Sequence, residues 1–129
     1  MAYEGPQIKI PGLTASADLR TKQYYLVKMS AAKTVTVCAA TTDKPIGVLQ
    51  NTPNSGEEAE VCVFGVTKVN SDANLGYGDS IGTAADGQAA AYTVSDTTKY
   101  IVGTIIEDNA AAGGYSTAVI NCANPRVLA

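Results

Sequence analysis

The stretch Ala59–Val69, AEVCVFGVTKV, carries the strongest fold information in the chain. It is the clearest strand signal, because four valines fall within eleven residues and no proline interrupts them. The turn formers of Asn51–Glu57 (NTPNSGE) precede it, and Ser71–Asn74 ends it. We therefore expect a long strand here.

Further short strands flank this one on both sides. Gln23–Ser30 and Lys33–Ala39 are separated by only two alanines, which predicts a hairpin. No segment keeps a 3.6-residue apolar period, although Ser16–Thr21 and Ser71–Leu75 could each form a single helical turn. Many short strands with turns between them predict an all-β fold, a small β-sandwich or β-barrel. The other predicted strands are Ile46–Gln50, Asp79–Thr83, Ala90–Val94, Tyr100–Glu107 and Tyr115–Cys122, followed by a surface tail at Ala123–Ala129.

The N-terminal arm, residues 1–14, differs from the rest of the chain. Pro6 and Pro11 remove ladder donors, so we expect an extended segment with no partner inside its own domain. It is either a frayed terminus or a segment that becomes ordered across a neighbouring subunit. In the second case the candidate capsid or subunit interface residues are Tyr3, Gln7, Ile8, Lys9 and Ile10.

Residues 15–129 form one predicted domain, because 129 residues cannot support two independent cores of this light composition. A weak internal repeat suggests the hypothesis of two similar β units, at about 17–66 and 73–121. Ala17-Asp18-Leu19 returns as Ala73-Asn74-Leu75, an offset of 73 − 17 = 56, and the same offset carries Gly47 onto Gly103. Chance similarity is the alternative, since Ala, Thr and Gly are common in this chain.

The amino-acid composition excludes several classes of function. A net charge of −3 argues against nucleic acid as a partner. There is no signal-peptide pattern and no apolar run long enough for a bilayer, so we expect a cytosolic product that does not bind membranes. The chain contains no His, which leaves its three cysteines without the usual partners for a metal site. We expect these thiols to be reduced and packed as small hydrophobes rather than to form a redox or metal site, at Cys38, Cys62 and Cys122.

The sequence offers little catalytic chemistry. Gly76-Tyr77-Gly78-Asp79 superficially resembles a nucleotide loop, but no helix follows, so we expect a tight turn. The acidic residues Glu57, Glu58 and Glu60, beside Asn54, could ligate a hard cation, although solvated charge explains them more simply. We therefore expect no catalytic, cofactor or metal residues and no small-molecule substrate. A paired-carboxylate hydrolase stays an alternative. The seven tyrosines suit either a protein interface or ordinary half-buried strand positions.

Three segments together resemble a known family: LTASADL (Leu13–Leu19), KPIGVLQNTPNSGEEAEVCVFGVTKV (Lys44–Val69) and GYGDSIGTAADG (Gly76–Gly87). Their order is similar to that of the small capsid decoration, or cement, proteins of tailed bacteriophages. The resemblance is good over Leu13–Gly87 and looser beyond it.

This resemblance implies a non-enzymatic structural virion protein with an all-β fold, usually a homotrimer. Such a protein is made in the host bacterial cytoplasm and binds the outside of the head, where it clamps neighbouring copies of the major capsid protein. Two alternatives stay open. One is a receptor-binding or adhesive module such as a head fibre, and the other is an enzyme of a small β-barrel type.

Overall fold

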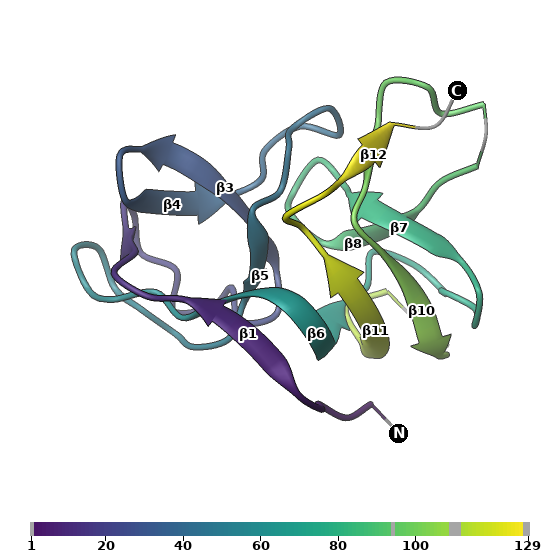
Figure 1. Ribbon diagram of the computed structural model, residues 1–129, viewed down its shortest axis with the longest axis horizontal. Helices are drawn as coiled ribbons and strands as arrows, with labels where there is room; N and C mark the ends of the chain where they lie inside the picture. Colours follow the sequence, from purple (N-terminus) through teal and green to yellow (C-terminus); the bar gives the residue numbers. More distant parts are fainter. Residues whose placement is uncertain (1, 94, 109–111, 128–129) are drawn as a thin grey trace.

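Every regular element of the structure, a computed structural model that describes residues 2–93, 95–108 and 112–127, is a β-strand (Figure 1). No helix occurs among these residues, including the two segments that could have formed single helical turns. The strands are β1 (Gln7–Ile10), β2 (Thr14–Ala15), β3 (Leu26–Ala31), β4 (Thr34–Val37), β5 (Gly47–Leu49), β6 (Val61–Asn70), β7 (Ser80–Thr83), β8 (Ala89–Ala91), β9 (Tyr100–Ile101), β10 (Gly103–Glu107), β11 (Tyr115–Asn121) and β12 (Arg126–Val127). The predicted all-β class is confirmed.

The most strongly predicted strand, β6, lies in the middle of the sheet. Ten strands form one open sheet in the order β2-β4-β3-β5-β6-β11-β10-β7-β8, and β1 pairs with β6 outside this path. The ten residues of β6 pair with β5 near Val61, with β11 along residues 64–70, and with β1 along residues 61–65. In Figure 1, β6 therefore lies between one group of strands that contains β3, β4 and β5 and another that contains β7, β10 and β11.

Two apolar cores lie on opposite faces of the middle strands. Leu26 belongs to one core and Val27 to the other, and the same split separates Val48 from Leu49 in β5. Successive side chains of a strand point to opposite faces, so both faces of β3 and β5 are covered here. A strand that is buried on both faces needs a nearly continuous apolar sequence, which explains the GVL of β5.

The N-terminal arm has a partner within its own chain. Ile8 of β1 pairs with Phe64 of β6, and the amide of Gly5 donates to the carbonyl of Val66 at 3.0 Å. The expectation that the arm lacks a partner in its own domain was therefore wrong. The approach is possible because Gly65 has no side chain: a Cβ there would collide with the carbonyl oxygen of Pro6.

Two other local expectations can be compared with the structure. The predicted hairpin is confirmed, since β3 pairs antiparallel with β4, with Val27 opposite Val37. Part of the tail, which was expected only to lie on the surface, forms the short strand β12 on β9, with Arg126 opposite Ile101. Two residues cannot display an alternating pattern, and so the sequence carried no signal for this pairing.

The two halves of the chain are arranged in a similar way in the sheet. The sheet order reads β4-β3-β5-β6 and then β11-β10-β7-β8, so each half contributes a similar series around the central β6–β11 pair. Gly47 of β5 and Gly103 of β10 also have similar surroundings. At each of them a Cβ would lie 2.5 Å from a carbonyl oxygen, that of Cys62 or that of Val119. These parallels support the hypothesis of two related β units.

Candidate protein-binding face

Large apolar side chains are exposed together on one side of the central strands. Ile8 and Phe64 are register partners, and Phe64 is opposite Asn121 in β11. Side chains of register partners, and of every second residue in a strand, lie on the same face of a sheet. We name this surface the β1–β6–β11 face and define it by five side chains with their exposed fractions: Tyr3 (49%), Ile8 (61%), Phe64 (47%), Tyr115 (46%) and Val119 (41%).

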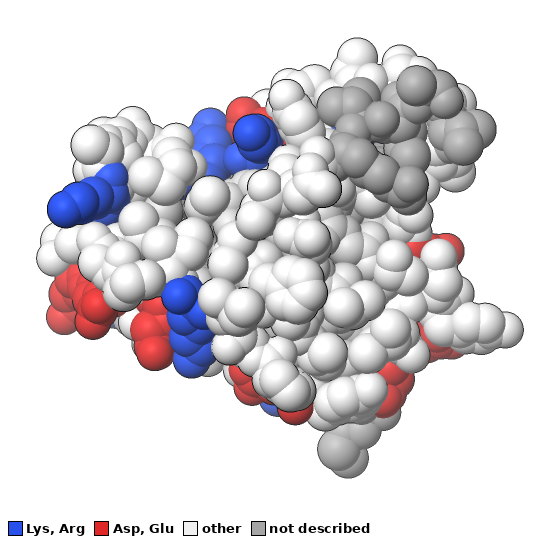
Figure 2. All heavy atoms as spheres, viewed as in Figure 1, with Lys and Arg blue, Asp and Glu red and all other residues white. Residues whose placement is uncertain are grey.

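The middle of the molecule is almost free of charge when viewed from this direction. Figure 2 shows a broad uncharged area over the region where Figure 1 places β6, β11 and β10, with charged side chains around its margins. One marginal pair is Lys9 and Glu60, whose Nζ and Oε1 atoms are 3.6 Å apart. Uncharged surface that exposes aromatic side chains is typical of the centre of a protein interface.

The first residues of the N-terminal arm are fixed on this face by polar contacts. The amide of Tyr3 donates to Oγ1 of Thr117 at 2.8 Å, and Thr117 is fully buried. The Tyr24 hydroxyl donates to Oε2 of Glu4 at 3.2 Å. Burial, and secondly the neighbouring Glu4 carboxylate, raise the pKa of Tyr24, so this hydroxyl keeps its proton at neutral pH.

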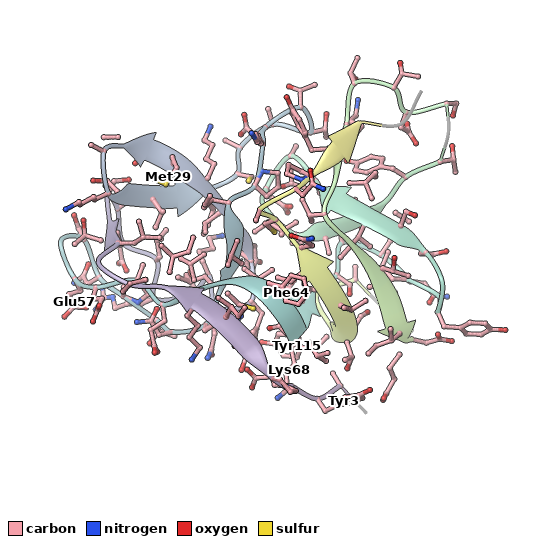
Figure 3. All side chains as sticks on the ribbon, viewed as in Figure 1. Tyr3, Met29, Glu57, Phe64, Lys68 and Tyr115 are labelled. Carbon is pink, nitrogen blue, oxygen red and sulfur yellow. The ribbon has the colours of Figure 1, made fainter. Side chains whose placement is uncertain are left out.

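An aromatic cluster lies beside the arm, and Figure 3 shows Tyr115 near Lys68 and Tyr3. The rings of Tyr24 and Tyr115 meet edge to face, with centroids 5.4 Å apart and planes at 81°. The Nζ of Lys68 lies 5.6 Å from the centroid of Tyr24. The arm is therefore positioned by side-chain contacts as well as by the four-residue ladder of β1.

The structure divides the five predicted interface residues into two groups. Tyr3 and Ile8 are exposed and lie on the β1–β6–β11 face, and Lys9 is exposed at its margin. Gln7 is half-buried, with its Nε2 donating to the Val66 carbonyl at 3.1 Å, and Ile10 packs against the second core. The geometry thus suits outward contact for the first group and support of the arm for the second.

Sequence reasoning missed two residues of this face, Phe64 and Val119. Phe64 is the only Phe of the chain. It lies in a strand whose residues are apolar at both alternating sets of positions, so the pattern did not reveal which face is exposed. For Val119, the burial of its neighbours Ala118 and Ile120 on the other face is visible only in the structure, because all three residues are apolar.

The thiols carry no reactive chemistry. All three are free and buried, which confirms the prediction that they pack as small hydrophobes. Burial raises the pKa of Cys38 to about 12, of Cys62 to about 11 and of Cys122 to about 12. Only the thiolate is nucleophilic, so these groups are inert near neutral pH.

The turn at 76–79, which superficially resembles a nucleotide loop, has a structural role. Residues 76–79 form the expected tight turn, in which the Asp79 amide donates to the Gly76 carbonyl at 3.1 Å and Gly78 has a φ of +85°. Within the described ranges, no cluster of three or more Cys, Asp or Glu side chains could hold a metal ion. The part of the chain that the structure describes also contains no helix long and apolar enough to cross a membrane.

Comparison with known proteins gives matches among solved structures only. No protein-family model and no curated protein matches the sequence. The N base of head fiber gp8.5 of bacteriophage phi29 superposes with a TM-score of 0.66 at 20% identity, over 91% of this chain and 96% of that one. A chain in the capsid of Myoviridae phage XM1 superposes with a TM-score of 0.59 at 20% identity, over 91% of this chain and 84% of that one.

The chain shares its fold with proteins of two phage heads. The likeness covers almost the whole domain, so it concerns the complete sheet and not one hairpin. At 20% identity it lies in the backbone, and the residues of the β1–β6–β11 face therefore have to be judged on their own geometry.

Proposed function

We propose that this chain is a structural protein of a phage virion that binds the outer surface of the head and stabilises contacts between major capsid proteins. The observation that carries the proposal is the fold shared with a phage head fiber base and a phage capsid chain over 91% of the sequence. The sequence resemblance to capsid decoration proteins points in the same direction. The role requires no catalysis, and we propose none.

The β1–β6–β11 face is the proposed contact surface. Its exposed aromatic and aliphatic side chains give apolar area at the centre, and Lys9 with Glu60 gives a polar rim. No strand among the described residues pairs with the second edge of β1. An extended segment of a capsid protein can therefore add to β1 through main-chain hydrogen bonds, with Ile8 and Phe64 supplying the apolar contact.

Repetition strengthens such a contact. A head presents many copies of the same site, and a homotrimer would engage several of them at once, so that individually weak contacts add through effective concentration. We propose a homotrimer on the outer virion surface, assembled from chains made in the host bacterial cytoplasm. A chain with a thin core of Val, Ile, Leu and Ala also gains stability from contact between subunits.

The N-terminal arm gives the first test. Deletion of residues 1–11 removes β1 and uncovers its partner residues in β6, while the ladder from β2 to β8 stays complete. We expect a folded but less stable protein that no longer sediments with phage heads. A deleted chain that binds heads as well as the full-length chain would contradict the proposed role of the arm.

A point substitution separates binding from stability. Ile8→Asp places a charge on an apolar side chain that is already 61% exposed, so the fold should tolerate it while head binding falls. Tyr77→Asp is the matched control, because Tyr77 is 78% exposed and lies on the turn at 76–79, outside the defined face. Equal binding by the two variants would show that the face does not contact the head.

The base of a head fibre is a second candidate function. It is favoured by the match to the phi29 head fiber N base, of which this chain covers 96%. Both candidates need attachment to a head and differ in what projects from it. Electron microscopy of heads carrying the native protein separates them: compact knobs favour decoration, and longer projections favour a fibre. Binding in a carbohydrate screen would favour the receptor-binding version of the second candidate.

A further inference from the structure

A second surface feature lies away from the β1–β6–β11 face. It is a pocket of about 350 Å³ beside β3 and the turn that leads into β5. Met29, which is 43% exposed, Pro45 and Ile46 supply its apolar wall, and Lys28 and Lys44 border it. We name it the Met29 pocket.

The charges at this pocket are incompletely neutralised. Lys28 is paired, since its Nζ lies 2.9 Å from Oδ2 of Asp43. The same Asp43 oxygen accepts the amides of Ala39 and Ala40 at 2.8 and 3.0 Å, so it is fully engaged. Lys44 is exposed, and no partner for its ammonium group occurs among the described residues. The pocket therefore combines apolar wall with a free positive charge and suits an acidic segment that carries aliphatic groups.

Such a segment is present on the chain itself. The loop 54–60, which we name the acidic loop, contains three exposed glutamates: Glu57, Glu58 and Glu60. Glu57 accepts the amide of Asn54 at 2.6 Å, and Glu60 pairs with Lys9. Glu58 is exposed, and its carboxylate has no partner in the described part of the chain.

The acidic loop and the Met29 pocket lie apart on the molecule. Figure 3 shows Met29 and Glu57 at separate ends of the part of the molecule built from β3, β4 and β5. In Figure 2, acidic side chains lie along the lower edge of this part with a basic side chain beside them, and basic side chains lie along its upper edge with an acidic side chain among them. A chain cannot bring its own loop into its own pocket in this arrangement, whereas a second copy can present its loop there.

We propose that the Met29 pocket of one copy receives the acidic loop of a second copy. Glu58 would pair with Lys44, and the methylene groups of the glutamates would cover Met29. Because the two surfaces differ, the contact is head to tail, and repetition of one such contact produces a closed ring when the rotation between copies permits it. The proposal names the subunit contact of the proposed homo-oligomer and is independent of attachment to a phage head.

Charge reversal tests this pairing directly. We expect the wild-type chain to self-associate in sedimentation velocity at low ionic strength and to dissociate as salt is added. Lys44→Glu and Glu58→Lys should each weaken self-association on the order of tenfold, since each replaces an attraction by a repulsion. The double variant K44E/E58K should restore it. Lys99→Glu is the control, because Lys99 lies in the turn before β9, does not line the Met29 pocket and donates to Thr98.

The possible outcomes are distinct. Restoration by the double variant, with K99E like wild type, supports the proposal. A wild-type chain that stays monomeric at its highest soluble concentration overturns it, and so does a double variant no better than the single ones. If only K44E weakens association, the pocket binds a segment other than the acidic loop, and the proposed pairing is wrong. Head binding by a monomeric wild-type chain would refute this contact while leaving the proposed attachment to the head intact.

Discussion

Gly65 determines how closely the N-terminal arm can approach β6, and Gly65→Ala is therefore the most informative substitution. Its φ of +135° lies in a region that residues with a side chain rarely adopt. A Cβ at this position would collide with the Pro6 carbonyl oxygen and lie 2.8 Å from the Cα of Gln7. Both neighbouring atoms belong to the backbone, so the arm has to move away as a unit.

The expected loss of stability has two parts. Backbone strain at a positive φ costs about 1–2 kcal/mol for a residue with a side chain. Displacement of the arm also breaks the hydrogen bonds from Gly5 to Val66 and from Val66 to Pro6, each worth about 1 kcal/mol net. The free energy of unfolding should therefore fall by about 3–4 kcal/mol, a large share of the stability of a small domain.

Urea denaturation combined with amide hydrogen exchange measures both parts. Gly56→Ala is the matched control, because Gly56 also has a positive φ, +84°, but no atom lies within 4 Å of the position that a Cβ would take there. It should lose only the strain part, about 1–2 kcal/mol, and leave the arm protected from exchange. Equal losses in the two variants, or an arm amide at Gly5 that stays protected in Gly65→Ala, would show that Gly65 does not control the approach of the arm.

The remaining predictions concern buried and paired groups. The three thiols should resist a thiol reagent at pH 8 in the folded protein and react fully in denaturant; rapid reaction in the folded state would contradict their burial. The pKa values of the folded thiols, about 11 to 12, lie above the ordinary 9.0, so the thiols of the unfolded chain ionise at a lower pH than those of the folded chain. The free energy of unfolding should therefore fall as the pH rises above about 9, which urea titrations at successive pH values would measure. Asp43→Ala should cost about 1–2 kcal/mol and Asp43→Asn less, because an amide oxygen can still accept both backbone amides; equal costs in urea denaturation would argue against those hydrogen bonds. The hydrogen bond from Lys28 lowers the pKa of Asp43, so its contribution should be present above the ordinary carboxyl pKa and be lost as the pH falls through the folded-state value, and a flat acid limb in wild type would contradict this.

Local signals predicted most of the fold. Val35 and Val37 alternate with threonines, and the resulting hairpin partner of β3 is present. The stretch around β6 was sufficient to predict a long strand, since turn formers bound it on both sides. These features depend on neighbours in sequence, where propensity and turn chemistry are informative.

Pairings between distant segments could not be predicted in this way. β1 pairs with β6 through Ile8 and Phe64, and this pairing is possible because Gly65 has no side chain. In the sequence, Gly65 cannot be distinguished from any other glycine in a strand. For the same reason, only part of the candidate face was predicted. Tyr3 and Ile8 were recognised from the unusual composition of the arm, whereas Phe64 joins them only through the register of a non-local pair.

Our main proposal is that the β1–β6–β11 face attaches this chain to the outside of a phage head. Electron microscopy of candidate phage capsids mixed with the purified protein is the decisive measurement. We expect ordered density at the junctions between capsomers, oriented so that Ile8 and Phe64 face the shell. Capsids without added density, or ordered density in which this face is turned toward solvent, would contradict the proposal.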